Sequence, residues 1–161
     1  PVFLAIVEKE SGRPLGIASY LRIHPAEGSI EVGHINFSPL LQRTTSATES
    51  MFLMMQWAFE AGYRRYEWKC NALNQASRRA AQRLGVSFEG IFRQMMIVKG
   101  RNRDTAWFAA IDREWPSLKT AEASLWPTTL KRRRSRVGQA RKLGCRKKER
   151  LFFTHRRKRE A

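Results

Sequence analysis

A group of hydroxyl side chains is the part of the sequence whose residue types and spacing most clearly suggest chemistry. Thr44, Thr45, Ser46 and Thr48 lie where a loop of small residues gives way to a helical pattern. The first N–H groups of a helix have no partner within the helix, and the helix dipole places partial positive charge beside them. A phosphate or pyrophosphate group can bind at such a point, and the hydroxyls can add donors. An ordinary polar N-cap without a ligand explains the same residues equally well.

The elements that must position this loop follow from two periodicities. Alternating or β-rich runs predict strands, and apolar residues at helical spacing predict helices. The predicted strands are residues 2–8, 15–23, 29–37, 65–71, 88–98 and 103–112. The predicted helices are residues 45–61 and 74–84. This order predicts an α+β fold with a mixed, mostly antiparallel sheet.

Charge divides the chain into two parts. The whole sequence of 161 residues has 31 Lys and Arg against 14 Asp and Glu, for a net charge of +17. Residues 1–116 hold 15 of the basic and 11 of the acidic residues, whereas residues 117–161 hold 16 and 3. We therefore expect one folded domain over residues 1–116 and a basic tail over residues 117–161. Residues 117–124 could form a helical turn, and disorder is expected from residue 127 onward.

The tail allows two interpretations. Its basic clusters between residues 131 and 159 could attract a nucleic acid by counterion release, although the small net charge of the body argues against a dedicated nucleic-acid fold. An abrupt change of composition after about residue 123 is also what a shifted reading frame would produce. At the other end, a strand pattern that starts at Pro1 without a methionine predicts a truncated or processed start.

Cys70 and Cys145 are the two cysteines of the sequence, too few for a disulfide framework and without metal-ligand spacing. We therefore expect a cytoplasmic protein without a metal site. No run approaches the about 20 apolar residues of a membrane span, so none is predicted. Cys70 is expected to be a small buried residue, because it lies in no motif that suggests a nucleophile.

The loop before the first helix reads Gln42-Arg43-Thr44-Thr45-Ser46-Ala47. It resembles the corresponding loop of the GNAT superfamily of N-acetyltransferases. The family loop runs Gln or Arg, two residues, Gly, one residue, Gly or Ala. Gln42 and Ala47 match this pattern, whereas Thr45 replaces the family glycine. The preceding strand carries Glu31-Val32-Gly33-His34, which is similar to the ribosomal-protein-acetyltransferase-like subgroup.

Motifs further along the chain resemble the same subgroup. Asn74, Ser77 and the Leu84-Gly85 pair follow its pattern in order, so the resemblance covers about residues 2–115. Two departures are present. The first strand and first two helices of the family, which shape the acceptor site, would have to precede Pro1. Ala81 stands where many relatives have a tyrosine that acts as an acid.

The resemblance implies acetyl-CoA as the acetyl donor and a GNAT-like sheet with flanking helices. The pyrophosphate would bind at the loop before the first helix, and the pantetheine arm would lie where strands 29–37 and 65–71 splay apart. The expected cofactor-binding residues are Ile35, Asn36, Phe37, Gln42, Arg43, Thr44, Thr45, Ser46, Ala47 and Asn74. Helix capping is the structural alternative for Asn74.

The resemblance also implies direct transfer to a primary amine in a ternary complex. Such an amine must lose a proton before it attacks, so a base is needed. Glu31 is the first candidate because it matches a catalytic glutamate of some relatives, and His34 is the second. Ser77 could protonate the departing thiolate. Each of the three could instead be a residue that only packs, caps or faces solvent.

The acceptor would be a small molecule or a protein N-terminus. Two other functions stay open, namely an inactive acetyltransferase fragment and a nucleic-acid-associated protein that acts through its basic tail. Met51, Met54 and Met55 are expected in the core. Trp68 could either belong to the core or line an acceptor pocket.

Overall fold

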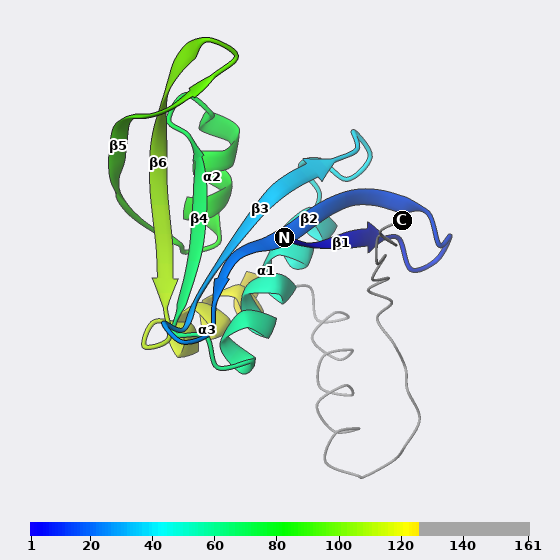
Figure 1. The fold of residues 1–161 in the computed structure, drawn as a ribbon. Coiled ribbons are helices and arrows are strands. Elements are labelled where there is room, and N and C mark those ends of the chain that lie inside the picture. The colour runs from blue at the N-terminus through cyan, green and yellow to red at the C-terminus, as the bar shows by residue number, and fades with distance from the viewer. Residues whose placement is uncertain (126–161) are drawn as a thin grey trace, which may run out of the picture.

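The computed structural model describes residues 1–125, with side chains described as far as residue 121. The described part contains six strands and three helices (Figure 1). The strands are β1 Val2–Val7, β2 Pro14–His24, β3 Ser29–Phe37, β4 Arg65–Asn71, β5 Ser87–Val98 and β6 Arg101–Ile111. The helices are α1 Thr45–Glu60, α2 Gln75–Arg83 and α3 Trp115–Leu125. All eight predicted elements are confirmed: β3 and β4 have the predicted ends, and the ends of the other six differ by at most two residues.

The strands form one sheet in the order β1-β2-β3-β4-β6-β5. β3 and β4 run parallel, and the other four neighbouring pairs run antiparallel. The parallel pair is possible because α1 carries the chain from the end of β3 back to the start of β4. The predicted α+β fold with a mixed, mostly antiparallel sheet is therefore confirmed.

The parallel pair is joined over only part of its length. Pairing runs from Ser29 and Arg65 to Val32 and Trp68, whereas β3 continues to Phe37 and β4 to Asn71. Beyond the last pair the two strands diverge, as Figure 1 shows. This splay leaves one backbone edge of each strand without the other as its partner.

A β-bulge accompanies the splay. The pairing of β2 with β3 slips between Ser19, which lies opposite Gly33, and Ile17, which lies opposite Asn36. His34, inside this slip, has a positive φ of 49°. Such a bulge bends its strand and increases the local twist, which turns the end of β3 away from β4.

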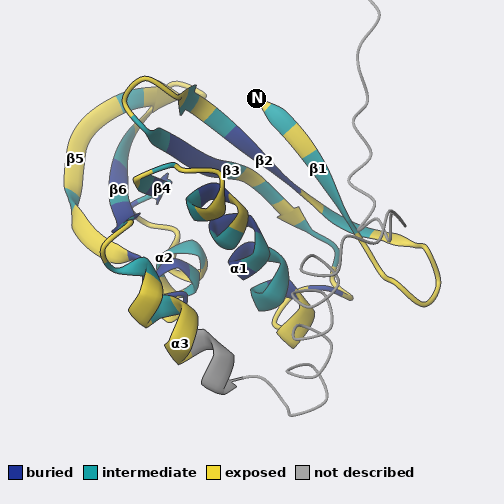
Figure 2. Ribbon diagram, turned by 90° about the horizontal axis from the view of Figure 1, so that it is seen from below, coloured by how far each residue is buried: buried dark blue, intermediate teal, exposed yellow. Residues whose placement is uncertain are grey.

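The core lies between the sheet and the helices. Alternate residues of β3 and β4 point to this face, including Ile30, Val32, Tyr66, Trp68 and Cys70. They pack against the buried residues of α1, among them Met51, Met54 and Met55, as expected for these methionines. Figure 2 shows all three helices in front of the same face of the sheet. Trp68 is 3% exposed, so it belongs to the core and does not line a surface pocket.

The expected domain boundary lies after residue 116, and α3, which begins at Trp115, runs across it. Trp115 stacks on Phe59 of α1 with 5.1 Å between ring centroids, and Leu118 packs on the core beside Gly85. The folded unit therefore includes the start of the segment that its charge assigned to the tail. Residues 127–161, and with them the predicted disorder and the predicted nucleic-acid contact, lie outside the described residues.

None of the three described helices is long and apolar enough to cross a membrane.

Candidate active site

The loop into α1 presents backbone donors at one point. Thr44 caps the helix, since its Oγ1 accepts a hydrogen bond from the Ala47 N–H at 3.1 Å and donates to the Leu41 carbonyl at 2.7 Å. The N–H groups of Arg43, Thr45 and Ser46 form no hydrogen bond with another described residue. Three neighbouring donors at the positive end of a helix are suited to an anion.

The side chains of this loop leave the donors accessible. Arg43, Thr45 and Ser46 are exposed, and Arg43 has a φ of 59°. Gln42 donates from Nε2 to the Phe37 carbonyl at 2.8 Å, so the loop is tied to the last residue of β3. Thr45, which stands in place of the family glycine, is exposed.

The splayed strands lead from this loop toward the middle of the sheet. Ile35 and Phe37 pack against the core, while Asn36 is exposed on the opposite face. The edge of β3 from Gly33 to Phe37 and the edge of β4 from Lys69 to Asn71 no longer pair with each other. Backbone N–H and C=O groups along such an edge can pair with the amide groups of an extended ligand.

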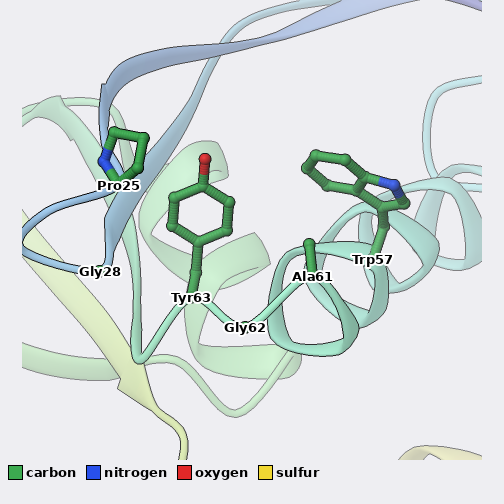
Figure 3. Close-up of a pocket in the computed structure, with 6 residues that line it drawn as sticks. All are labelled: Pro25, Gly28, Trp57, Ala61, Gly62 and Tyr63. Carbon is green, nitrogen blue, oxygen red and sulfur yellow. The ribbon is translucent and has the colours of Figure 1, made fainter.

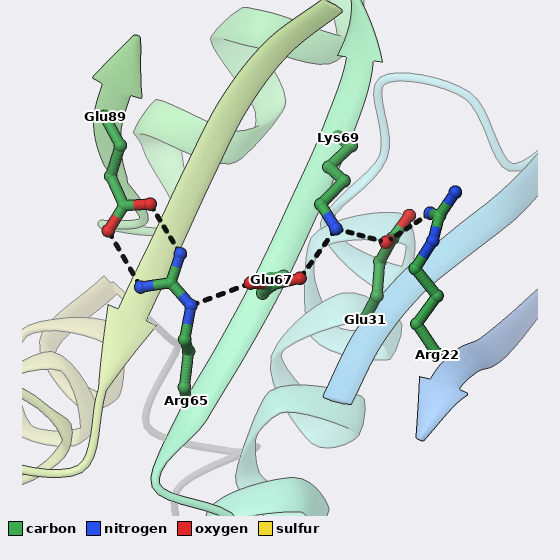
Figure 4. Close-up of polar contacts among 6 residues, drawn as sticks. All are labelled: Arg22, Glu31, Arg65, Glu67, Lys69 and Glu89. Atoms are coloured by element: carbon green, nitrogen blue, oxygen red, sulfur yellow. Dashed lines mark hydrogen bonds and ion pairs between the residues drawn. The ribbon is translucent and has the colours of Figure 1, made fainter. Parts of the chain in front are cut away.

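The face of the sheet away from the helices, called here the distal face, carries a chain of charges (Figure 4). Glu31 Oε2 accepts from Arg22 Nη1 at 2.6 Å and lies 2.9 Å from Lys69 Nζ. Lys69 Nζ also lies 2.7 Å from Glu67 Oε2. The chain continues through Arg65, which bonds Glu67 at 2.7 Å and forms two bonds to Glu89.

Lys69 is the buried centre of this chain of charges. Its side chain is 8% exposed, against 5% for Glu31 and 15% for Glu67. Its Nζ lies 3.7 Å from the centre of the Trp107 ring, which adds a cation–π contact. Lys69 is the first residue of β4 after the last pair with β3, so it stands where the splay begins.

The pKa of Glu67 reflects these partners. Burial acts to raise the pKa of this carboxyl, but hydrogen bonds from Lys69 and Arg65 outweigh it and hold the pKa below the ordinary value of 4.5. The carboxylate form of Glu67 is therefore part of the folded structure.

His34 lies on the distal face through the bulge of β3. Its Nδ1 is 2.7 Å from the Oγ of Ser19, and its ring lies against Phe3 with 5.2 Å between centroids. The imidazole is exposed, whereas Ser19 is completely buried. Ser19 was not among the predicted site residues, because nothing in the sequence shows that it lies opposite this histidine.

The structure places Asn74 and Ser77 at the start of α2, directly after β4. Asn74 caps the helix, since its Oδ1 accepts from the Ser77 N–H at 3.0 Å. Ser77 Oγ accepts from the Trp68 Nε1–H at 2.9 Å. The Asn74 side-chain oxygen therefore serves as a helix cap, as in the structural alternative given for this residue. The Asn74 amide nitrogen and the Ser77 hydroxyl proton are still available for other contacts.

A shallow hollow lies at the other end of the parallel pair. Its lining residues are Pro25, Gly28, Trp57, Ala61, Gly62 and Tyr63 (Figure 3). Its volume is about 230 Å³. These residues precede the starts of β3 and β4, whereas the splay is at their ends, so no predicted site residue lines this hollow.

Alternation in residues 65–70 could have identified part of the distal face. Arg65, Glu67 and Lys69 alternate with apolar residues, so a strand must present the three charges on one side. Arg22 could not be found this way. It reaches Glu31 from a bulged position of β2 with a φ of 44°.

Comparison with known proteins identifies the fold. Residues 1–87 match the model of the acetyltransferase (GNAT) domain family. A GCN5-related N-acetyltransferase from Brucella melitensis is 55% identical, with a TM-score of 0.75, over 77% of this chain and 57% of that one. A probable acetyltransferase of the GNAT family from Chromobacterium violaceum is 50% identical, with a TM-score of 0.69, over 71% of this chain and 58% of that one. No curated protein sequence matches.

A more distant likeness concerns the fold alone. The spermidine/spermine N-acetyltransferase SpeG from Vibrio cholerae is 14% identical, with a TM-score of 0.64, over 71% of this chain and 69% of that one. This chain spans less than three fifths of the length of the two more similar structures. Because the family model matches more than half of the chain, the protein belongs to the GNAT acetyltransferase family.

Proposed function

We propose that this chain is an acetyl-CoA-dependent N-acetyltransferase that transfers the acetyl group directly to a primary amine. The observation that carries the proposal is the splay of the parallel strands β3 and β4 beyond Val32 and Trp68. Beside it, at the start of α1, lie three N–H groups that have no partner within the described part of the chain. One feature is suited to an extended amide-containing arm and the other to a pyrophosphate. The loop from β3 to α1 connects the two features, and the hydrogen bond from Gln42 Nε2 to the Phe37 carbonyl ties this loop to the end of β3.

The residues present fit the cofactor. Arg43, Thr45 and Ser46 would donate backbone N–H groups to the pyrophosphate, and the Arg43 guanidinium would add positive charge. The edge of β3 from Ile35 to Phe37 would pair with the pantetheine arm. Asn74, at the start of α2, could donate from its amide nitrogen. When bound, the thioester supplies an activated acetyl group.

Residues of the chain would position the amine and move the protons. Amine nitrogen bonds to the acetyl carbon, the carbon–sulfur bond breaks, the amine proton passes to a base, and the thiolate takes a proton. Glu31 and His34 are the two candidate bases, and both lie on the distal face of β3 near the splay. Ser77 would provide the proton to sulfur. Holding the amine against the thioester supplies much of the rate.

The position of Cys70 supports direct transfer. Its thiol is buried, with 5% exposure, and points to the core among the residues that face α1. An acyl-enzyme would need this thiol at the surface where the substrates meet. We therefore propose a ternary complex without a covalent intermediate.

The acceptor class and the cellular setting are part of the proposal. The acceptor would be a small primary amine or a protein N-terminus, in the cytoplasm, and the enzyme would belong to the ribosomal-protein-acetyltransferase-like subgroup. Contact of a nucleic acid with residues 131–159 would be an additional property of the tail. The alternative is that the chain is an inactive acetyltransferase fragment, in which case no amine would be acetylated.

Release of free CoA tests the proposal. The chain is incubated with acetyl-CoA and a panel of polyamines, aminoglycosides, amino-acid amides and peptides with free N-termini, and thiol release is followed. We expect release with at least one primary amine and intersecting lines in double-reciprocal plots. The Cys70→Ala variant should keep its activity. Parallel lines together with an acetylated Cys70 would exclude the ternary mechanism, and no release with any amine would exclude the activity.

A further inference from the structure

We propose that Ser19 is a positioning residue that holds the His34 ring with its Nε2 unprotonated, and that this Nε2 is the base that takes the proton from the acceptor amine. The inference rests on the proposed acetyl transfer, which left Glu31 and His34 as alternatives. It follows from the hydrogen bonds, burial and backbone geometry at the bulge of β3.

Ser19 has two potential partners and no access to solvent. Its Oγ lies 2.7 Å from His34 Nδ1 and 3.2 Å from the Gly33 carbonyl oxygen. Its residue exposure is 0%. A serine hydroxyl has a single proton to donate, so it can donate to one of these partners and must accept from the other, or leave one unpaired.

Only one arrangement satisfies all three groups. The carbonyl of Gly33 can only accept, so the Ser19 proton goes to it. His34 Nδ1 must then carry a hydrogen and donate it to Ser19 Oγ. The reverse arrangement, in which Ser19 donates to Nδ1, would give up the bond from Ser19 to the Gly33 carbonyl and leave the buried hydroxyl oxygen without a donor. A neutral His34 therefore has its free lone pair on Nε2.

The backbone directs this nitrogen to the distal face. Ile30 and Val32 point to the core before the bulge, and Ile35 and Phe37 point to it after the bulge. His34 takes the extra position with a φ of 49°, so its side chain is on the distal face. A histidine in this conformation carries backbone strain, which the surrounding strands must offset. Nδ1 faces Ser19, and the residue as a whole is exposed.

Glu31 is less free than His34 to accept a proton. Glu31 is 4% exposed, and its Oε2 accepts from both Arg22 and Lys69. An amine would have to displace these cations to use that oxygen. The charged side chains that face this part of the distal face are Arg22 from β2, Glu31 from β3 and Lys69 from β4, while β1 contributes Phe3.

A ¹⁵N NMR spectrum of the histidine ring nitrogens tests the assignment in the free protein. Under alkaline conditions, the full chain should show His34 with a protonated Nδ1 and a bare Nε2, with signals assigned by loss in His34→Gln. In Ser19→Ala the preference for this tautomer should disappear. Thr105→Val is the matched control, since Thr105 is also a buried hydroxyl but, unlike Ser19, has no hydrogen-bond partner among the described residues. It should leave the His34 signals unchanged.

Kinetics with the responsive amine complete the test. Ser19→Ala should lower kcat about tenfold or more, approaching the loss in His34→Gln, while KM for acetyl-CoA changes less than twofold. Ser19→Cys, whose slightly larger thiol is only a weak hydrogen-bond donor and acceptor, provides the same test if the alanine variant does not fold. Unchanged kcat in both Ser19 variants, or a bare Nδ1 in the native chain, would overturn the inference. An inactive native chain would refute the proposed function alone, because the NMR result stands without turnover.

Discussion

Replacement of Lys69 by methionine should destabilise the fold strongly, although the lysine lies on a sheet face and not in the core. Lys69 is 8% exposed and is the shared cation between Glu31 and Glu67, which are 5% and 15% exposed. Removing one partner of a buried ion pair costs about 3–5 kcal/mol. Each carboxylate keeps one other cation, Arg22 or Arg65, so we expect the lower end, about 3 kcal/mol.

Urea unfolding followed by tryptophan fluorescence measures this loss, and thermal unfolding should show a Tm lower by roughly 10 °C. Lys119→Met is the matched control, because Lys119 forms a 3.5 Å ion pair with Glu60 in which both side chains are nearly half exposed. That exposed pair should contribute less than about 1 kcal/mol. Equal effects of the two substitutions would refute the view that Lys69 is an essential buried cation.

The same variant has a pH signature. The pKa of Glu67 is held below 4.5 in the folded chain, so Glu67 contributes stability above that pH and loses it as the pH falls through the lower folded value. Lys69→Met removes one of the two hydrogen-bond donors responsible. The variant should therefore lose less additional stability on acidification below about pH 4.5 than the native chain. A stability difference between the two proteins that stays constant from pH 6 to pH 3 would contradict this linkage.

Two further substitutions test the packing around α2. Gly85→Ala should lower the free energy of unfolding by about 1–3 kcal/mol, because Gly85 has a φ of 74° and an added Cβ would overlap the Leu118 side chain. Gly100→Ala is the control, since Gly100 has a φ of 72° but open space around it, and it should cost only about 1 kcal/mol. Urea unfolding measures both losses. Equal losses would show that α3 does not pack on this turn. Ser77→Ala should lower kcat less than His34→Gln does, because a CoA thiolate leaves tolerably well without a proton donor. The same variant should shift the NMR signal of the Trp68 indole N–H, which donates a hydrogen bond to Ser77 Oγ. An unshifted indole signal would contradict the contact.

The fold could be predicted from the sequence because its signals are local. Strand alternation in residues 65–71 and helical spacing in residues 45–61 each act within one element, so the eight predicted elements came out within two residues of their observed ends. α3 was the exception. Only a helical turn could be expected there, since what stabilises α3 is the contact of Trp115 with Phe59 and of Leu118 with the core, across long separations in the chain.

The candidate site was predictable only where it depends on one segment. The helix N-terminus at Thr44 and its cap could be predicted from a run of hydroxyl residues. Ser19 and Arg22 could not, because their partners depend on the register of β2 against β3 and on two bulges. Trp68 shows the same limit, since alternation placed it on a strand but did not say which face the helices would cover.

Calorimetric titration with acetyl-CoA tests the central claim most directly, by comparing the native chain with the Thr45→Asp, Ser46→Asp double variant. Two acidic side chains facing the pyrophosphate would add about 2 kcal/mol of repulsion, which is a roughly 30-fold loss of affinity. Acidic residues in the first turn favour a helix, so α1 should stay folded. Ser117→Asp with Thr120→Asp, both exposed on α3, is the control of equal charge.

The account predicts binding to the native chain and to the α3 control, and a loss of roughly 30-fold or more in the α1 double variant. Equal affinity of all three proteins for acetyl-CoA would contradict the placement of the pyrophosphate at the start of α1, and no binding to the native chain would contradict the cofactor itself.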